Sequence, residues 1–586
     1  MDQKRFILAM VLSAGVLFGW QMFFAPERPE QTTNTQEQTD QTGSEATDGE
    51  ETADKTETDA QNGEANGADK TDGSESGESD EPIGQKVMDQ AAPEREVETA
   101  THKMASGRMH LTLTNTDGGR VRHIHLDKPE QYQKKGDLLG AFPKPPAHLP
   151  YRVGLAEGQI PMPDSPTYEF VEDESELTDE GEADGKTYGK VVYRYEDPKG
   201  RFAIDKVFEI DESKPYVVNL DVHFHNRLEE TKLSDALALD IFGYKDPDQE
   251  TSFLNFRPNE VEGVCQMTGE TQRSSITSIE EPMKYDGSEV IWGAIDTRYF
   301  LMAAVPLDGA QTCAIEKMDD GYLRTRVGYD RFSVLPGETY TAEHVLFMGP
   351  KDIDDLHTVG HNLSNSVNYG MFAFIARPLR WALDYLYKYV GNWGLAIILL
   401  TIIIKLLTWP INMKAYRNME DMKKIQPKLE EVREKYEDDQ QRMTEETMKM
   451  FRENDVSPMG GCLPMLMQMP ILYGLYVMIY YSVELYQADF MLWYTNLAAP
   501  DPYYVLPLLM GAVMYVQQGM MGSAAGTTNM QAKVMTKVMP VMFTAFMLFL
   551  PSGLVLYYSI NLMIGLGQQF YIRGFPWEDD EAEATT

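Results

Sequence analysis

The apolar stretch from Gly391 to Asn412 constrains this chain most. It reads GNWGLAIILLTIIIKLLTWPIN, and about twenty mostly apolar residues suffice to cross a bilayer core of roughly 30 Å. One full charge, Lys405, lies inside the stretch, roughly 18 Å along a helix from Trp393. A charge near a bilayer centre costs at least about 2.5 kcal/mol on insertion scales. Either the Lys405 ammonium group therefore reaches water at the membrane surface, or its buried charge serves a function.

Three polar residues accompany this charge. Thr401, Lys405, Thr408 and Asn412 are spaced four, three and four residues apart, so a helix places them on one face. Such a polar stripe predicts that this face meets something other than lipid. The alternative is that the Lys405 side chain snorkels to the nearer headgroup layer.

The charge of the chain is large but unevenly distributed. The 586 residues carry a formal net charge of -39, and the length is too great for one ordinary domain. Residues 27–100 hold 22 acidic against five basic residues and almost no aromatic or branched apolar side chains. We predict an acidic disordered linker there, because so little apolar surface cannot offset the entropy of ordering. The acidity also argues against direct recognition of nucleic acid.

Residues 1–26 are predicted to form an N-terminal transmembrane anchor. Lys4 and Arg5 precede an apolar run from Phe6 to about Ala25. A signal peptide would show a shorter apolar core and a cleavage site of small residues. The run instead ends in aromatic residues, which suit the membrane interface. We expect an uncleaved anchor with its N-terminus in the cytoplasm.

Residues 101–350 have the alternating pattern of β-strands. Segments such as YVVNLDVHFHNR and RFAIDKVFEID alternate apolar and polar residues, and turn sequences such as Asp-Pro-Lys-Gly separate them. Many short strands without long helical periods predict one large β-sandwich domain. The acidic insert from Glu169 to Gly185 is expected to be a loop.

Two local patterns in this domain invite a metal-binding interpretation. His123 with His125, and His223 with His225, are H-x-H pairs on predicted strands. Residues i and i+2 of a strand share a face and could hold a metal ion. No carboxylate motif joins either pair, however. We therefore expect no metal, no cofactor and no catalytic residue.

The chain has three cysteines, Cys265, Cys313 and Cys462. Their spacing fits neither a disulfide framework nor a zinc site. Cys265 and Cys313 could pair if their domain is exported, but nothing in the spacing demands it.

Two amphipathic regions flank the opening stretch. Residues 370–390 interleave Arg377, Arg380 and Lys388 with aromatic and apolar residues, which favours a helix lying in the membrane interface over a soluble docking helix. Residues 413–455 carry ten basic and twelve acidic residues with apolar residues at helical spacing. This pattern predicts a helical hairpin outside the membrane, with Pro427 kinking its first arm.

Four further apolar segments follow, and loop charges orient them. The segments are Cys462–Val483, Tyr503–Met520, Val538–Leu550 and Leu554–Ile572. Basic residues are abundant in the 413–455 loop, absent from 484–502, and present again at Lys533, Lys537 and Arg573. The positive-inside rule then gives six spans, both termini in the cytoplasm and the β domain outside. The cations of residues 377–388 are the exception to this pattern.

The predicted spans contain very little charge. Lys405 is the only clearly buried charge, and the last four spans hold no acid, although neutral polar residues are scattered through them: Gln468, Ser482, Gln517, Gln518, Thr544, Ser559, Asn561 and Gln568. Ion-coupled carriers usually place acidic residues near the midplane, which argues against a solute channel or transporter. A sugar-processing enzyme on a membrane anchor is a third alternative, which the lack of a paired-carboxylate or metal motif opposes.

A cation in a polar-lined groove suits a passing polypeptide. Abundant methionines in these spans would form soft walls for varied apolar partners. An acidic tail would be drawn towards Lys405, and the attraction is stronger in a low dielectric than in water. No nucleotide-binding motif occurs in the sequence, so hydrophobic partitioning of the apolar helix into lipid must supply the energy.

Several sequence strings together resemble a known family. GNWGLAIILLTIIIKLLTWP, VSPMGGCLPMLMQMPILYGLY, DPYYVLPLLMG and PSGLVLYYSIN are similar to the YidC-type membrane protein insertases of Gram-negative inner membranes. The resemblance is specific over about 371–575. Over the β domain the resemblance rests on the position of that domain in the chain and on its alternating pattern of apolar and polar residues.

The resemblance implies an α-helical polytopic membrane protein with six transmembrane helices and a large periplasmic β-sandwich. Five spans over 391–575, with the cytoplasmic hairpin 413–455, would form the insertase core, followed by an acidic tail at 576–586. It further implies a substrate groove, open to cytoplasm and lipid, whose lining is assigned to these residues: Thr401, Lys405, Thr408, Asn412, Gln468, Tyr557 and Tyr558.

The implied function is insertion and chaperoning of integral membrane proteins in the inner membrane, without enzymatic activity. Implied partners are nascent membrane proteins, the Sec translocon, lipid, and the ribosome and targeting factors at the hairpin. The β domain would resemble a sugar-epimerase-like sandwich that is largely dispensable for insertion.

Two features depart from the family pattern. Relatives usually have arginine where this chain has Lys405, and lysine keeps the charge but lacks the planar fork. Relatives often have a basic C-terminal tail that meets ribosomes, whereas this tail reads WEDDEAEATT and would repel ribosomal RNA.

Overall fold

The computed structural model describes residues 97–573, except 117, 128–137, 140–141, 144–145, 164, 179–185, 248–260, 458–462 and 523–529. The anchor predicted over 1–26, nearly all of the linker over 27–100 and the tail over 576–586 lie outside the described residues. The same holds for the end of the acidic insert and for residues 458–462, the rest of the VSPMGGC string after its first two residues.

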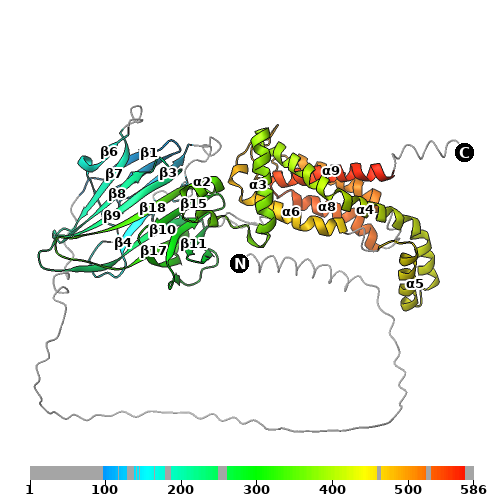
Figure 1. The fold of residues 1–586 in the computed structure, drawn as a ribbon, viewed down its shortest axis with the longest axis horizontal. Coiled ribbons are helices and arrows are strands. Elements are labelled where there is room, and N and C mark those ends of the chain that lie inside the picture. The colour runs from blue at the N-terminus through cyan, green and yellow to red at the C-terminus, as the bar shows by residue number, and fades with distance from the viewer. Residues whose placement is uncertain are drawn as a thin grey trace, which may run out of the picture. The chain divides into compact units, whose positions relative to one another are not determined.

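The first part of the described chain is built from β-strands (Figure 1). The strands are β1 Thr101–Ala105, β2 Met109–Thr114, β3 Arg120–Leu126, β4 Arg152–Leu155, β5 Glu169–Phe170, β6 Glu176–Leu177, β7 Thr187–Glu196, β8 Phe202–Ile210, β9 Val217–Asn226, β10 Leu233–Tyr244, β11 Glu262–Met267, β12 Glu270–Ser275, β13 Met283–Tyr285, β14 Val290–Asp296, β15 Phe300–Pro306, β16 Ala310–Lys317, β17 Tyr322–Val334 and β18 Thr339–Pro350.

These strands form two long runs of neighbours. The first runs β3–β2–β1–β7–β8–β9–β18–β15–β14–β11–β12, and only the β1–β7 pair in it is parallel. The second runs β4–β10–β17–β16–β13 and is antiparallel throughout. A single pair, Val290 with Ala310, joins β14 to β16. The runs pack face to face, as expected for a sandwich.

The alternating sequence pattern accounts for the core between these layers. In β9, Val218, Leu220, Val222 and Phe224 are buried, while the residues between them are half-exposed. Successive side chains of a strand point to opposite faces, so the period of two puts one apolar row inside. The predicted β-sandwich is confirmed.

The acidic insert differs from its prediction in part. The sequence indicated a loop from Glu169 to Gly185, but β5 and β6 lie inside it and both pair with β7. A strand of two residues is too short to show the alternation of apolar and polar residues from which strands are predicted. They form because β7 offers an unpaired edge whose backbone groups need partners.

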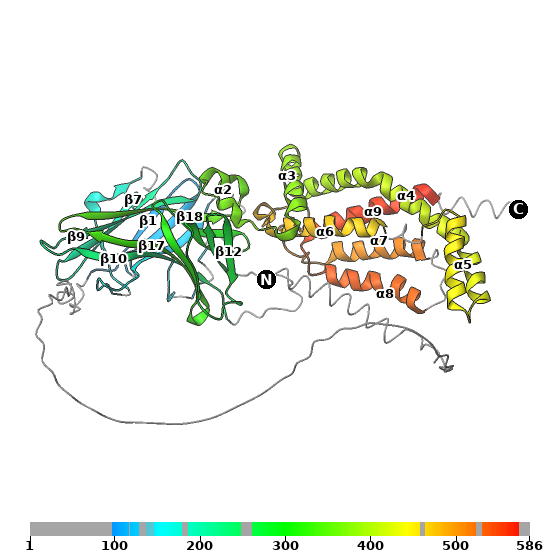
Figure 2. The ribbon, with the colours of Figure 1, turned by 60° about the horizontal axis from the view of Figure 1, so that its bottom comes forward.

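The second part of the described chain is helical, and both views show most of its long helices running alongside one another (Figures 1 and 2). The helices are α2 Ile353–Val359, α3 Ala373–Val390, α4 Trp393–Lys435, α5 Gln440–Glu453, α6 Leu463–Tyr481, α7 Val505–Gly522, α8 Met530–Met547 and α9 Ser552–Arg573.

The opening stretch and the first arm of the predicted hairpin form one continuous helix. α4 has 43 residues and runs through Pro410 and Pro427. It ends before the acidic triplet Glu437–Asp439, and α5 turns back beside it (Figure 1). Ile425, Leu429 and Val456 make a small core between the two arms. Ile425 and Leu429, two of the apolar residues at helical spacing in 413–455, therefore contribute to the contact between the arms.

Candidate functional site

α4 buries its polar face and exposes its apolar face. Lys405 is only 7% exposed and Thr401 is fully buried, while Leu406 and Leu407 are 62% and 75% exposed. A helix in water does the reverse. Large apolar side chains on an outer face require an apolar surrounding, and a bilayer is such a surrounding. One described helix, Trp393–Met422, is long and apolar enough to cross a membrane, while Val505–Gly519 and Val538–Met547 are shorter apolar helices.

The same inversion recurs in α7, α8 and α9, of which α9 packs against α4 and α7 packs against both α8 and α9. Exposed apolar residues on them are Leu508, Leu509, Val516, Val538, Val541, Met542, Phe546 and Met563. Buried polar residues on α7 and α9 are Gln517, Ser559, Asn561, Gln568 and Gln569. A group of helices with polar contacts inside and apolar side chains outside is the arrangement that a membrane core favours.

Most polar groups of the α4 stripe are hydrogen-bonded within the helix. The Thr401 hydroxyl donates to the Ile397 carbonyl at 2.7 Å, and the Thr408 hydroxyl to that of Ile404 at 3.0 Å. The Asn412 amide donates to the Thr408 hydroxyl at 3.1 Å. Such i−4 bonds make Thr tolerable in a membrane helix. Lys405 differs, because no carboxylate among the described residues pairs with its ammonium group.

Gly565 on α9 marks the point where polar groups of α4 and α7 approach α9. A Cβ atom at Gly565 would lie 3.1 Å from the Gln517 amide nitrogen, 3.2 Å from the Tyr416 hydroxyl and 3.6 Å from the Lys405 ammonium. Gln517 comes from α7, while Tyr416 and Lys405 come from α4. The absent side chain of Gly565 leaves the space that these groups occupy.

The face of α9 around Gly565 is lined with amides. Asn561, Gln568 and Gln569 lie four before, three after and four after Gly565, so all share its face. Gln568 is 1% exposed, and neither its oxygen nor its nitrogen has a hydrogen-bond partner among the described residues. Buried amides without partners are costly. We call the combined set the polar seam: Thr401, Lys405, Thr408, Asn412, Tyr416, Gln517, Asn561, Gln568 and Gln569.

The remaining predicted residues, Gln468, Tyr557 and Tyr558, make other contacts. The Gln468 amide on α6 donates to the Tyr557 hydroxyl on α9 at 2.5 Å. The Tyr558 ring packs against Phe543 of α8, with 5.1 Å between the centroids. Thus Tyr557 and Tyr558, adjacent in sequence, contact different helices.

Tyr416 and Gly565 were not anticipated from the sequence. Tyr416 follows Asn412 by four residues and so continues the stripe, a signal that was available. Gly565 gave no signal, because one glycine among several in a span does not indicate what approaches it. Gln517 and Asn561 were visible only as scattered polarity.

Asp501 organises the end of the helices where α7 begins. Its carboxylate accepts hydrogen bonds from Trp493 Nε1 and the Tyr494 hydroxyl, both at 3.1 Å, and from the backbone nitrogens of Tyr503 and Leu506 at 3.0 and 2.9 Å. Burial alone would raise the pKa of Asp501, but these hydrogen bonds outweigh it and hold the pKa below its usual value.

The loop before α7 also contacts the first turns of α4 and α9. Asn392 caps α4 through Leu395 and donates to the Phe490 carbonyl at 3.1 Å. A Cβ at Gly394 would lie 2.0 Å from the Phe490 ring, so only glycine fits there. The nitrogens of Ser552 and Gly553 donate to the carbonyls of Ala499 and Leu497. The loop therefore closes this end of the helices.

A buried ion pair joins α3 to the end of α6. Arg380 of α3 pairs with Glu484 just beyond α6 and with Asp384 one turn along its own helix. Arg380 and Glu484 are 7% exposed each. Burial raises the pKa of Glu484 to about 7, although Arg380 opposes that rise. This ion pair fixes one face of α3 against the end of α6. The aromatic residues Phe374, Trp381 and Tyr389 of α3 remain exposed.

The second histidine pair of the β domain, His223 and His225, is engaged in hydrogen bonds with neighbouring side chains. His223 bonds to Thr341 at 2.9 Å, and His225 to Thr339 at 2.7 Å and Asp205 at 3.2 Å. Within the described ranges, no three His, Cys, Asp or Glu side chains are grouped so as to hold a metal ion.

Comparison with known protein families covers most of the chain. Residues 104–382 match the family described as YidC periplasmic domain. Residues 385–578 match the family described as 60Kd inner membrane protein. The boundary between the matches falls inside α3.

Individual relatives agree with these matches. The membrane protein insertase YidC of Syntrophus aciditrophicus is 38% identical over 377 residues, which cover 64% of this chain and 67% of that protein. The insertase YidC of Geobacter sulfurreducens is 42% identical over 48% of this chain and 53% of its own length. That of Syntrophobacter fumaroxidans is 36% identical over 64% and 69%. The chain thus spans about half to two thirds of the length of the curated relatives it matches.

One solved structure, an active YidC insertase with its first transmembrane domain resolved, matches 81% of this chain and 93% of its own at 20% identity and a TM-score of 0.36. A score this low does not establish a common arrangement of the two whole chains. From the two family matches and the identities with these relatives, this chain belongs to the YidC family of membrane protein insertases.

Proposed function

We propose that the protein inserts integral membrane proteins into the inner membrane and helps them to fold. The observation that carries this proposal is the inverted α4 helix, with Lys405 buried and Leu406 and Leu407 outside. A charge held inside a lipid-exposed helical bundle has a cost that selection tolerates for a function. A polar interior beside lipid suits a substrate that has both polar and apolar segments.

The polar seam would receive the polar tail of the client. Lys405 has no carboxylate partner among the described residues, so an acidic tail would supply the missing counter-charge. The amide of Gln568, which has no hydrogen-bond partner among the described residues, would gain hydrogen bonds from the client backbone or from water. In this scheme the groove is lined by Lys405 and its stripe, with Gln468, Tyr557 and Tyr558 on its α6 and α8 sides.

The apolar helix of the client would leave sideways into lipid. Burial of apolar surface is favourable by about 25 cal/mol per Å², so partitioning supplies the free energy and no cofactor or enzymatic step is needed. The loop held by Asp501 would keep the groove closed on the outer side. The exit into lipid and the cytoplasmic entrance would stay open.

Loop charges support a multi-pass topology in the inner membrane. The basic residues of 413–455, Lys533, Lys537 and Arg573 favour the cytoplasm. Both termini would then be cytoplasmic, with the β domain of 101–350 in the periplasm. On this scheme 370–390 lies in the interface, where the exposed Phe374, Trp381 and Tyr389 of α3 would enter the headgroup region.

The proposed partners are nascent membrane proteins, lipid and the Sec translocon, with insertion alone or beside the translocon. The hairpin of α4 and α5 projects charged faces on both arms and is the proposed contact for ribosomes and targeting factors. The acidic tail would repel ribosomal RNA, so that contact is assigned to the hairpin alone.

Depletion tests this function. Cells depleted of the protein would be pulse-labelled for a short membrane client with an acidic translocated tail, and tail exposure would be followed by protease accessibility from the periplasmic side. A client that is secreted by its own signal peptide serves as the control. We expect insertion of the acidic-tailed client to fall several-fold while the control continues. Normal insertion in depleted cells would contradict the proposal.

A further inference from the structure

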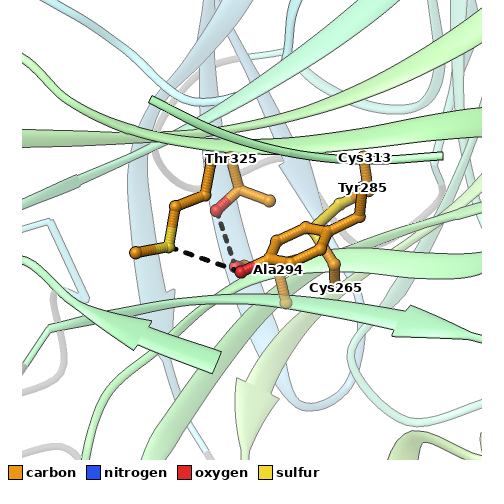
Figure 3. The surroundings of a disulfide bond; sticks show 6 residues. Cys265, Tyr285, Ala294, Cys313 and Thr325 are labelled. Atoms are coloured by element: carbon orange, nitrogen blue, oxygen red, sulfur yellow. Dashed lines mark hydrogen bonds between the residues drawn. A yellow bond between two sulfur atoms is a disulfide. The ribbon is translucent and has the colours of Figure 1, made fainter. Parts of the chain in front are cut away.

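Cys265 and Cys313 are joined by a disulfide bond in the β domain (Figure 3). Their Cα atoms are 5.9 Å apart. Cys265 lies on β11, which pairs with β12 and β14, and Cys313 lies on β16, which pairs with β13 and β17. The bond therefore connects the two facing layers rather than neighbouring strands of one layer.

The layers approach unusually closely around this bond. A Cβ at Gly263 would lie 2.4 Å from the Ile315 side chain, and one at Gly293 would lie 2.5 Å from Val327 and 3.6 Å from the Cys313 sulfur. The Thr325 hydroxyl donates to the Ala294 carbonyl across the same gap at 3.0 Å (Figure 3). Glycine on one layer thus permits the contact that brings the two sulfurs together.

The bond is shielded from solvent in the folded domain. Both cysteines are fully buried, as are their neighbours Trp292, Ile315 and Val327. Tyr285 of β13 lies opposite Cys313 in the antiparallel β13–β16 pair, and its ring lies beside the disulfide bond (Figure 3). Exchange requires a thiolate to reach a sulfur in line with the bond. No such approach is open without separating the layers.

We propose that Cys265–Cys313 is a covalent clamp that is formed by thiol–disulfide exchange outside the cytoplasm, before the two layers close. Two thiols lose two protons and two electrons to the oxidised disulfide of an extracytoplasmic thiol oxidoreductase, which becomes a dithiol. The exchange passes through a mixed disulfide between that protein and one of the two cysteines. When the two layers close, they bury the new disulfide bond and make it inaccessible to reductants.

The location in this inference rests on the proposed topology, because stable disulfides belong to oxidising compartments. Its failure is nevertheless distinguishable from failure of the insertase function. If the protein inserts clients but carries free thiols in place of the disulfide, the clamp is wrong and the insertase function stands. If the protein carries the disulfide but does not insert clients, the insertase function is wrong and the clamp stands.

The redox state is measured by counting thiols. Cells are quenched in acid, and the full chain is denatured and alkylated with a maleimide, either before or after reduction. Mass spectrometry of the intact chain then gives the number of maleimide adducts. The chain has three cysteines, so we expect one adduct without reduction, at Cys462, and three after it. Cys265→Ser is the matched control and should give two adducts under both conditions. Three adducts without reduction in the wild type would overturn the proposal.

The order of bond formation and closure is tested on the native protein. Purified full chain in detergent is treated with reductant with or without denaturant, the reductant is removed, and both samples are then denatured and alkylated. We expect one adduct in the native protein and three in the denatured protein. If a closed sandwich excludes reductant, it excludes oxidant equally, so the bond must precede closure. Three adducts in the native protein, at the rate found in denaturant, would contradict this order.

Discussion

Lys405 on α4 and Gly565 on α9 face each other so closely that a Cβ at Gly565 would lie 3.6 Å from the Lys405 ammonium nitrogen. The ammonium is therefore directed into the contact between α4 and α9 rather than along α4 towards the headgroups. Snorkelling would carry it away from this glycine. The position of the charge inside the helices depends on a residue that lies 160 positions away and has no side chain.

Gly565→Ala should weaken insertion of acidic-tailed clients several-fold. The new methyl group would crowd Gln517, Tyr416 and Lys405, and at least one of these polar groups must move. Gly567→Ala is the matched control, because no atom lies within 4 Å of a Cβ there and both changes gain up to about 1 kcal/mol of helix propensity. Protease protection of the client tail in proteoliposomes is the measurement. Equal activity of the two variants would show that the contact is unimportant.

The Gln468–Tyr557 hydrogen bond should couple α6 to α9. Interhelical hydrogen bonds in membrane proteins average about 0.6 kcal/mol in double-mutant cycles. Gln468→Leu and Tyr557→Phe should each lower stability, and the double variant should lose less than the sum, because the second change removes a group already left unpaired. Reversible unfolding of the full chain in mixed micelles measures the cycle. Strict additivity would mean that the bond contributes nothing.

Asp501→Ala should loosen the loop that closes one end of the helices. The variant loses an acceptor for the Trp493 and Tyr494 side chains and for two backbone nitrogens at the start of α7. Loss of a helix cap alone costs typically about 1 kcal/mol. Hydrogen exchange over 490–506 should accelerate, whereas Asp501→Asn, which keeps one acceptor oxygen, should accelerate it less. Unchanged exchange in the alanine variant would contradict the assignment.

Asp240 should make the β domain sensitive to acid. Its carboxylate on β10 is 1% exposed and accepts bonds from Arg326 at 2.6 and 2.9 Å and from Arg152 at 3.1 Å. Burial alone would raise the pKa of Asp240, but Arg326 and Arg152 outweigh it and hold the pKa below its usual value. A depressed pKa stabilises the fold above the unfolded value, about 3.9, and the contribution disappears as pH falls through the folded value.

Thermal unfolding of the full chain between pH 2 and 7 tests this dependence. We expect Asp240→Asn to be less stable at pH 7 by roughly 3–5 kcal/mol, because arginines would remain without their carboxylate, and to lose part of the acid-induced decrease in Tm. Asp286→Asn is a control, since Asp286 is largely exposed. A variant with wild-type stability at pH 7 would contradict the role of Asp240.

Local features were predictable from the sequence, and contacts between distant segments were not. The face shared by Thr401, Lys405 and Asn412 follows from helical spacing alone. The approach of Gly565, Gln517 and Tyr416 depends on how three helices pack, which no local pattern encodes. The break between α4 and α5 was visible as an acidic triplet, whereas the continuity of α4 from membrane segment to hairpin was not, because its composition changes midway.

The β domain shows the same division. Alternation in segments such as Val217–Asn226 predicted strands and their buried faces. Pairing of Cys265 with Cys313 could only be left open, because it requires knowing that β11 and β16 lie in facing layers. The short strands β5 and β6 depend on an edge offered by β7 rather than on their own residues.

The charge of Lys405 is the most direct test of the account as a whole. Proteoliposomes containing the wild type, Lys405→Arg or Lys405→Glu would be compared for insertion of two clients that differ only in an acidic or a neutral tail. We predict that Lys405→Arg retains insertion of the acidic-tailed client, that Lys405→Glu loses it at least tenfold, and that the neutral client is affected less. Equal insertion of the acidic-tailed client by the arginine and glutamate variants would contradict the central claim.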